Sequence, residues 1–130
     1  MPLLKINLVK GRSDQAVDLL LDCIHDAIVS AFSVPPTDRY QVVYQHESAH
    51  LHLLDTGLGL ERSNEVVLIE VISRARTQAQ KEEFYRLVCD LLQANCSTAP
   101  SDIVIVFTEN GDADWSFGNG RAQFLTGELQ

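Results

Sequence analysis

Apolar and polar residues follow a regular pattern along the first 46 residues, and this pattern predicts a strand, a helix and a second strand. Leu3 to Val9 is a short apolar run with polar residues interleaved, which is typical of a strand. From Asp14 to about Phe32, apolar residues recur every three or four positions, as on one face of a helix. The Pro35-Pro36 pair forbids further helix, and the aromatic and β-branched residues from Arg39 to Gln45 predict the second strand.

The second half of the chain follows the same plan. Glu65 to Ser73 is a strongly apolar strand, Thr77 to Asn95 has a helical pattern, and Asp102 to Thr108 is another predicted strand. Between the halves, His46 to Asn64 contains few periodic apolar residues and is expected to be a long connection, with a hairpin as one form it can take. The tail, residues 111–130, combines large aromatic residues with glycines and is expected to pack onto another surface.

The two halves superpose in sequence when one is shifted by 64 residues, the step from Ser13 to Thr77, with no insertion. We therefore predict one domain over residues 1–130, built from a pseudo-repeat of residues 2–46 and 66–110. Right-handed crossovers make each strand pair parallel. The predicted fold is α+β, a four-stranded mixed sheet with two helices on one face, and other copies of the chain are expected to cover the bare face.

Composition and charge narrow the classes of partner. The chain has 130 residues, of which 45% are hydrophobic, and a formal net charge of −8, so nucleic acid and anionic membranes are poor candidate partners. No stretch approaches the roughly 18 apolar residues of a membrane span, and the first residues do not resemble a secretion signal. The cysteines, Cys23, Cys89 and Cys96, lack CxxC spacing and are expected to be reduced, as in a cytoplasmic protein.

Two features suggest chemistry at the strand ends. Arg74 and Arg76 are spaced by two, so in a continuing strand both guanidinium groups point to one face, where they can bind a carboxylate. The alternative is a pair of solvated surface arginines. Pro2 is small enough to permit removal of Met1, which exposes a secondary amine, although a proline is also a common strand opener. If the two central strands run antiparallel, Pro2 comes near both arginines.

Other patterns in the chain are weaker. His46, His50 and His52 form a cluster whose spacing matches no closed zinc pattern, so we predict no metal site. The Gly57-Leu58-Gly59 segment is followed by neither lysine nor serine or threonine at the spacing of a phosphate-binding loop, and no nucleotide site is predicted.

The N-terminal proline, the duplicated β-α-β unit and the arginine pair together resemble the tautomerase superfamily. Within it, several segments look like malonate semialdehyde decarboxylase and its relatives, over nearly the whole chain. These segments are Pro36-Thr37-Asp38-Arg39-Tyr40-Gln41, Asp55-Thr56-Gly57-Leu58-Gly59, Ser73-Arg74-Ala75-Arg76, Asp114-Trp115-Ser116-Phe117-Gly118 and Ala122-Gln123-Phe124-Leu125-Thr126-Gly127-Glu128-Leu129.

The resemblance implies a homotrimer that needs no cofactor and acts on a small carboxylic acid. It implies Pro2 as the catalytic amine, assisted by Asp38, Arg74 and Arg76. It also implies a pocket wall formed by Trp115, Phe117, Phe124 and Leu129.

The charge state of the amine decides the chemistry. A carboxylate at Asp38 near Pro2 favours the ammonium form, which polarises a carbonyl and suits decarboxylation of malonate semialdehyde or a similar β-oxo acid. A Schiff base between Pro2 and the aldehyde is another route. Two other functions remain open: a keto-enol tautomerase or hydratase of a 2-oxo or unsaturated acid, and a non-catalytic trimeric interaction protein.

Overall fold

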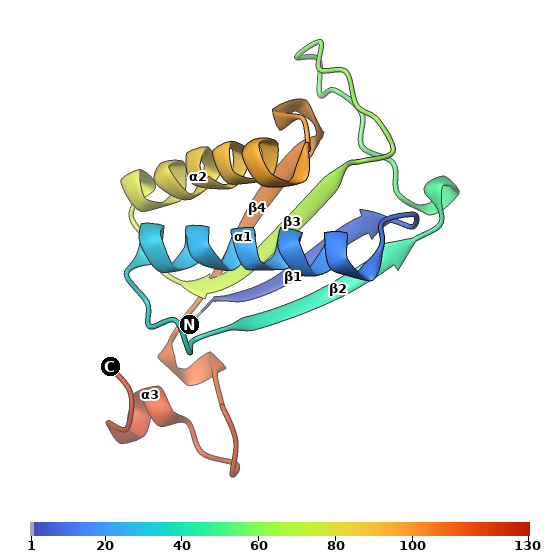
Figure 1. Cartoon of the computed structure of the whole chain (residues 1–130). Coiled ribbons are helices and arrows are strands. Elements are labelled where there is room, and N and C mark those ends of the chain that lie inside the picture. The colour runs from blue at the N-terminus through green and yellow to red at the C-terminus, as the bar shows by residue number, and fades with distance from the viewer. Residues whose placement is uncertain (1) are drawn as a thin grey trace.

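The fold was obtained as a computed structural model, and it describes residues 2–130. Two β-α-β units follow one another along the chain, and a tail of short turns follows them (Figure 1). The main elements are β1 (Leu3–Val9), α1 (Asp14–Phe32), β2 (Tyr40–His46), β3 (Val67–Arg74), α2 (Gln78–Cys96) and β4 (Ile103–Asn110). The tail ends in a single helical turn, α3 (Gln123–Thr126).

The four strands form one mixed sheet in the order β2-β1-β3-β4. Strands β1 and β2 are parallel, as are β3 and β4, while the central pair, β1 and β3, is antiparallel. Both long helices lie on one face of the sheet (Figure 1). The predicted α+β fold is therefore confirmed, and the antiparallel central pair brings the start of β1 to the end of β3.

The two helices are capped at equivalent positions. The hydroxyl of Ser13 accepts a hydrogen bond from the third residue of α1, and Thr77 does the same for α2 within a capping box with Gln80. Both helices end at a serine in the left-handed conformation, Ser33 and Ser97, each 64 positions from its counterpart. Matching local signals thus give the two halves helices of equal length.

The core lies between the sheet and the helices. Alternate residues of β1 and β3 point to the helical face, because successive side chains of a strand point to opposite faces. They meet the apolar stripes of α1 and α2, and the completely buried side chains include Ile6, Leu20, Ile24, Ile69 and Phe84. Cys23 belongs to this core, and burial next to Cys96 raises the pKa of its thiol to about 11, so the thiol stays protonated.

The opposite face of the sheet carries apolar side chains that the described chain covers only in part, such as Tyr40, whose ring packs against Phe117 of the tail. Tyr40, Val42 and Tyr44 on β2 remain 40–41% exposed. A polar row crosses the same face. The Asn7 amide donates to the Glu70 carboxylate at 3.0 Å, and its oxygen lies 2.9 Å from His46 Nε2 on β2. This face has the character of a surface that another chain covers.

The connection between the two halves is a loop and not the hairpin that was one of its expected forms. Within residues 47–66 the structure contains a 3-10 turn, Ser48–His50, and no strand, so a hairpin is wrong there. Asp55 instead closes the loop by accepting hydrogen bonds from the backbone N–H groups of Gly57 and Gly59. Side chain to backbone bonds of this kind replace strand pairing in short polar loops.

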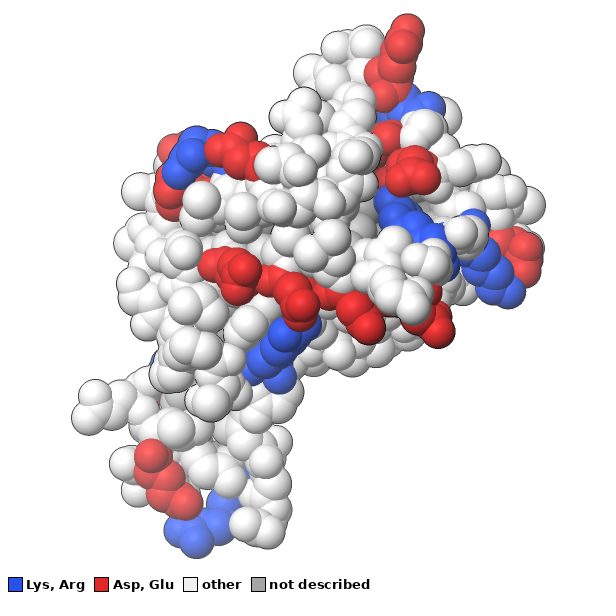
Figure 2. Space-filling model, viewed as in Figure 1, with Lys and Arg blue, Asp and Glu red and all other residues white. Residues whose placement is uncertain are grey.

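The outer surface of α1 is acidic. Figure 2 shows Asp and Glu side chains in a row along this helix, and the exposed residues Asp14, Asp18, Asp22 and Asp26 follow one another at intervals of four. This arrangement opposes binding of phosphate backbones at the helical face. Among the described residues, no helix has the length and apolar character that crossing a membrane requires.

Candidate active site

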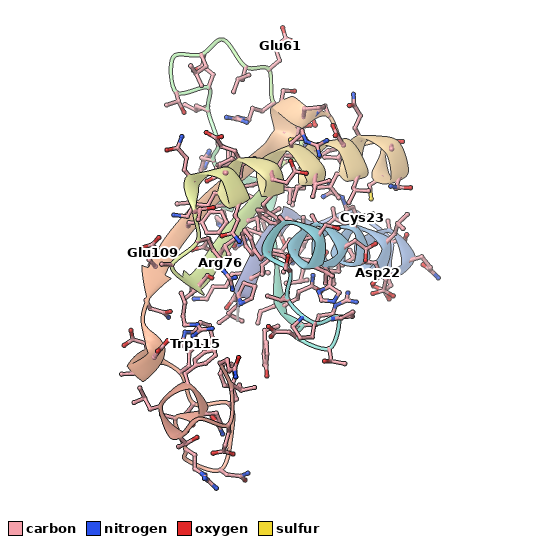
Figure 3. All side chains as sticks on the ribbon, turned by 90° about the vertical axis from the view of Figure 1, so that its left-hand side faces the viewer. Asp22, Cys23, Glu61, Arg76, Glu109 and Trp115 are labelled. Carbon is pink, nitrogen blue, oxygen red and sulfur yellow. The ribbon has the colours of Figure 1, made fainter. Side chains whose placement is uncertain are left out.

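A cavity of about 300 Å³ opens where three parts of the fold meet. The parts are the end of α1 with the turn after it, the end of β3, and the tail. The residues that line it are Phe32, Ser33, Val34, Pro35, Asp38, Arg74, Arg76, Phe124, Leu129 and Gln130. Figure 3 shows Arg76 at the end of the sheet from which the tail with Trp115 extends. The cavity therefore combines apolar walls with two cations and one carboxyl group.

Asp38 lies in the turn that joins α1 to β2. Its backbone N–H donates to the Pro35 carbonyl at 2.9 Å, which closes the turn after the helix. The side chain is only 5% exposed, and among residues 2–130 no donor reaches its Oδ1 atom. Burial raises the pKa of this carboxyl group, while the nearby charges of Arg76, His25 and Arg74 act in the opposite direction.

Arg76 follows β3 and is half-buried. Its Nε donates to the hydroxyl of Ser73 at 3.3 Å, and its guanidinium carbon lies 4.9 Å from the centre of the Phe32 ring. Burial and the charge of Arg74 lower its pKa, and Asp38 raises it. The terminal nitrogens make no hydrogen bond to residues 2–130, so they can donate to a bound anion.

Arg74 is more fully engaged by the protein. One terminal nitrogen is 2.9 Å from the Asp112 carboxylate, and the other donates to the main-chain oxygen of Gln130 at 2.9 Å. Its guanidinium carbon lies 3.6 Å from the centre of the Phe124 ring, which is a close cation–π contact. The two arginines therefore differ, because Arg74 fastens the tail to the sheet whereas Arg76 faces the cavity with free donors.

Pro2 lies directly before β1 and is buried. The neighbouring Leu3 pairs with Tyr40, the first residue of β2, and with Ile72 near the end of β3. This register puts Pro2 between the turn that carries Asp38 and the end of β3. Pro2 is not among the residues that line the cavity, and Met1, whose removal the sequence suggested, lies outside the described residues.

Only two of the four residues predicted to form the pocket wall line the cavity. Phe124 and Leu129 line it, whereas Trp115 and Phe117 do not. Phe117 packs edge-on against Phe124 at 5.3 Å and stacks on Trp115 at 5.4 Å with an angle of 12° between the rings. These two residues thus support the wall from behind in the single chain.

Several site residues were missed in the sequence. Phe32 was predicted only as the end of a helix, and the Pro35-Pro36 pair next to it is the one signal that the chain turns there. Asp112 and Gln130, which hold Arg74, lie in the tail and carry no pattern that connects them with an arginine far away in sequence. His25 is a buried polar residue on the apolar stripe of α1, and that position was a signal.

Two histidines of the cluster noted in the sequence make hydrogen bonds within the fold, away from the cavity. The Nε2 atom of His46 is 2.9 Å from the Asn7 side chain, and that of His52 is 2.7 Å from the Ala49 carbonyl. Within residues 2–130, no three His, Cys, Asp or Glu side chains are grouped as metal ligands would be.

Comparisons with known proteins agree with this architecture. A family model described as "Tautomerase enzyme" matches residues 38–118, and a second one with the same description matches residues 2–61. A Bacillus subtilis (strain 168) protein described as the probable tautomerase YrdN is 45% identical over 129 residues, which is 99% of this chain and 100% of that protein.

Solved structures are similar over the whole fold. A malonate semialdehyde decarboxylase structure is 52% identical with a TM-score of 0.97, covering 98% of this chain and 99% of the other. FG41 malonate semialdehyde decarboxylase, inhibited by 3-bromopropiolate, is 38% identical with a TM-score of 0.93, covering 98% and 97%. A fused 4-OT trimer, 19% identical with a TM-score of 0.78, covering 96% and 98%, shares the fold. This chain therefore belongs to the tautomerase family.

Proposed function

We propose that this protein is a cofactor-independent decarboxylase of malonate semialdehyde or a similar small β-oxo acid, with Pro2 as its catalytic amine. The observation that carries the proposal is the cavity in which Arg76, Arg74 and the buried Asp38 meet at the end of the sheet where β1 begins. The similarity to two malonate semialdehyde decarboxylase structures at 52% and 38% identity supports this choice of substrate.

In the proposed reaction, removal of Met1 leaves Pro2 with a protonated secondary amine, and Asp38 stabilises its positive charge. Arg76 binds the substrate carboxylate through its free donors, and Arg74 adds positive charge beside it. The bond between the carboxylate and the α-carbon breaks, and its electron pair moves to the carbonyl oxygen, next to the ammonium group. Carbon dioxide leaves, and a proton added to the carbon of the resulting enolate gives acetaldehyde.

The apolar walls contribute to this reaction. Phe124 and Leu129 border the cavity, with Phe117 and Trp115 behind them, and we propose all four as substrate-binding residues. A carboxylate in an apolar pocket is less well solvated than in water. The apolar walls therefore favour the step in which the carboxylate loses its charge and becomes neutral carbon dioxide.

We also propose that the protein assembles as a homotrimer. The partly covered apolar face of the sheet, with Tyr40, Val42 and Tyr44 half-exposed, requires a partner, and a second and third copy of the chain can supply matching surfaces. The partners are then other copies of this chain and a small acid.

A second function with the same residues is keto-enol tautomerisation or hydration of a 2-oxo or unsaturated acid. Burial raises the pKa of Asp38, and a protonated Asp38 would no longer stabilise the ammonium form of Pro2, which favours a neutral amine that can act as a base. The description of the Bacillus subtilis relative as a probable tautomerase also favours this reaction.

Direct assay decides between the two functions. Purified protein, with its N-terminus checked by intact mass for loss of Met1, is given malonate semialdehyde and, separately, phenylpyruvate enol. We expect decarboxylation to be the faster reaction, and its rate to fall as pH rises past the pKa of the amine. A tautomerase rate that dominates and falls on the acidic side would replace the first function by the second.

A matched pair of variants tests the carboxylate clamp. Arg76→Ala is expected to reduce kcat/KM roughly 30-fold or more, because loss of one partner of a buried, hydrogen-bonded charge pair costs about 2–5 kcal/mol. Arg86→Ala removes an exposed arginine that pairs with Glu83 and Asp90 on α2, and it is expected to leave turnover unchanged. Near-normal turnover of the Arg76 variant would remove the clamp from the proposal.

A further inference from the structure

His25 is a buried polar residue for which the proposed reaction has no direct use. It lies on α1, it is only 9% exposed, and it belongs to the stripe of residues that faces the interior. Its Nε2 atom is 2.7 Å from the backbone carbonyl oxygen of Pro36. Because a carbonyl can only accept, Nε2 carries the proton in this bond.

The hydrogen bond connects the helix to the turn that carries Asp38. Pro36 lies two residues before Asp38, and the Pro35 carbonyl accepts from the Asp38 N–H, so the turn is short and tightly connected. On the other side of Asp38, Arg39 pairs with Asp22 of α1 at 2.9 Å, but both side chains are well exposed. Exposed ion pairs hold their partners weakly. The buried His25 bond is therefore firmer than this ion pair.

Asp38 depends on its backbone for its position. Among residues 2–130, no side-chain or backbone donor reaches its buried Oδ1 atom. The charged and titratable groups of the described chain that act on this carboxyl group are Arg76 and Arg74 from the end of β3 and His25 from α1. Without hydrogen bonds of its own to these groups, the carboxylate points where the turn directs it.

We propose that His25 is a positioning residue for Asp38, holding the Pro36 carbonyl so that the carboxylate stays directed toward the Pro2 amine. This inference rests on the proposed function, in which Asp38 stabilises the protonated amine. His25 does not touch the substrate. Its effect is transmitted through the turn, and a shift of about 1 Å in a catalytic group can cost roughly 100-fold in rate.

The test compares three variants of the full-length, processed protein. His25→Leu introduces an apolar side chain of similar size and removes the donor, whereas His25→Gln supplies an amide N–H that can reach the same carbonyl. Ile28→Val is the matched control, because it removes one methyl group from the buried face of the same helix without altering the turn. If His25→Leu does not fold, His25→Met provides a second side chain without a donor.

The main measurement is the pKa of the Pro2 amine, which is obtained from ¹⁵N NMR of proline-labelled protein as a function of pH. The kinetic constants kcat and KM and the melting temperature Tm are measured for the same variants. In His25→Leu we expect the amine pKa to fall and kcat to drop about 10- to 100-fold, with little change in KM. His25→Gln is expected to restore most of both quantities. Ile28→Val is expected to lower Tm while leaving the amine pKa and kcat unchanged.

The outcomes separate this inference from the proposed function. An unchanged amine pKa in a folded His25→Leu protein, or equal impairment in the Leu and Gln variants, would overturn the positioning role and leave His25 as a packing residue. If the wild-type protein decarboxylates none of the β-oxo acids but His25→Leu still lowers the amine pKa, the proposed reaction fails and the positioning role stands.

Discussion

The guanidinium carbon of Arg74 lies 3.6 Å from the centre of the Phe124 ring, although the two residues are 50 positions apart in the sequence. This contact joins the end of β3 to the tail, which otherwise extends away from the sheet (Figure 1). The tail supplies Phe124 and Leu129 to the cavity. The Arg74–Phe124 contact therefore closes one side of the candidate active site.

Loss of the Phe124 ring should weaken binding of the carboxylate substrate. Phe124→Leu keeps an apolar side chain but removes the π-face on which Arg74 lies. Since a cation–π contact contributes about 0.5–2 kcal/mol, we expect KM to rise about 2- to 30-fold. Phe124→Tyr retains the ring face and is the control. The measurement is steady-state kinetics with malonate semialdehyde, and equal KM values for the Leu variant and the wild type would show that the contact does not orient Arg74 for binding.

Removal of the negative charge at Asp112 should strengthen substrate binding. Asp112→Asn keeps an oxygen that can accept from Arg74 but no longer competes as an anion with the substrate carboxylate. Asp112 is about half-exposed, and exposed pairs are worth about 0–1 kcal/mol, so we expect KM to fall by less than about fivefold. Glu109→Gln, which removes an equal charge opposite Lys81, is the control and should leave KM nearly unchanged. A higher KM in the Asp112 variant would mean that its charge is needed to orient Arg74.

Asp38 should make the fold less stable at neutral pH than a neutral side chain would. Burial raises its pKa, so the folded state binds more protons than the unfolded state between the ordinary carboxyl pKa and the raised value. The free energy of unfolding therefore falls as pH rises through that interval. We therefore expect the unfolding free energy of Asp38→Asn, measured with urea, to increase relative to that of the wild type as pH rises from acidic to neutral. The same variant is expected to lose activity.

The control for this pH dependence is Asp22→Asn, which neutralises an exposed carboxylate on α1 that pairs with Arg39. Its unfolding free energy should stay within about 1 kcal/mol of the wild-type value. A relative stability of Asp38→Asn that decreases toward neutral pH would show that attraction to Arg76 and Arg74 outweighs the effect of burial.

The periodicity of the sequence was sufficient to predict the helices and strands. The strand over Leu3–Val9 and the helix over Asp14–Phe32 have the predicted bounds, because the Pro35-Pro36 pair and the Ser13 cap mark the helix ends locally. Elsewhere the strands begin or end one or two residues from the predicted positions. Pairing with a neighbouring strand, which single-sequence patterns do not contain, decides these ends.

The connection and the tail were less predictable. Apolar spacing could not distinguish a hairpin from a loop closed by Asp55, because that choice depends on bonds from one side chain to two backbone N–H groups. Likewise, nothing in the spacing of the tail indicated that Phe124 would meet Arg74, whereas Trp115 and Phe117 would pack behind it.

The sequence by itself determined the two β-α-β units, the helix ends and the spacing of Arg74 and Arg76, because each of these depends on residues close together in the chain. Only the tertiary structure decided that β1 and β3 are antiparallel, and with it that the start of β1 lies near Asp38 and the arginines. It also decided that Arg74 is held by the tail while Arg76 remains open to the cavity. These relationships depend on contacts between distant segments, which form only when the helices and sheet bury a common core.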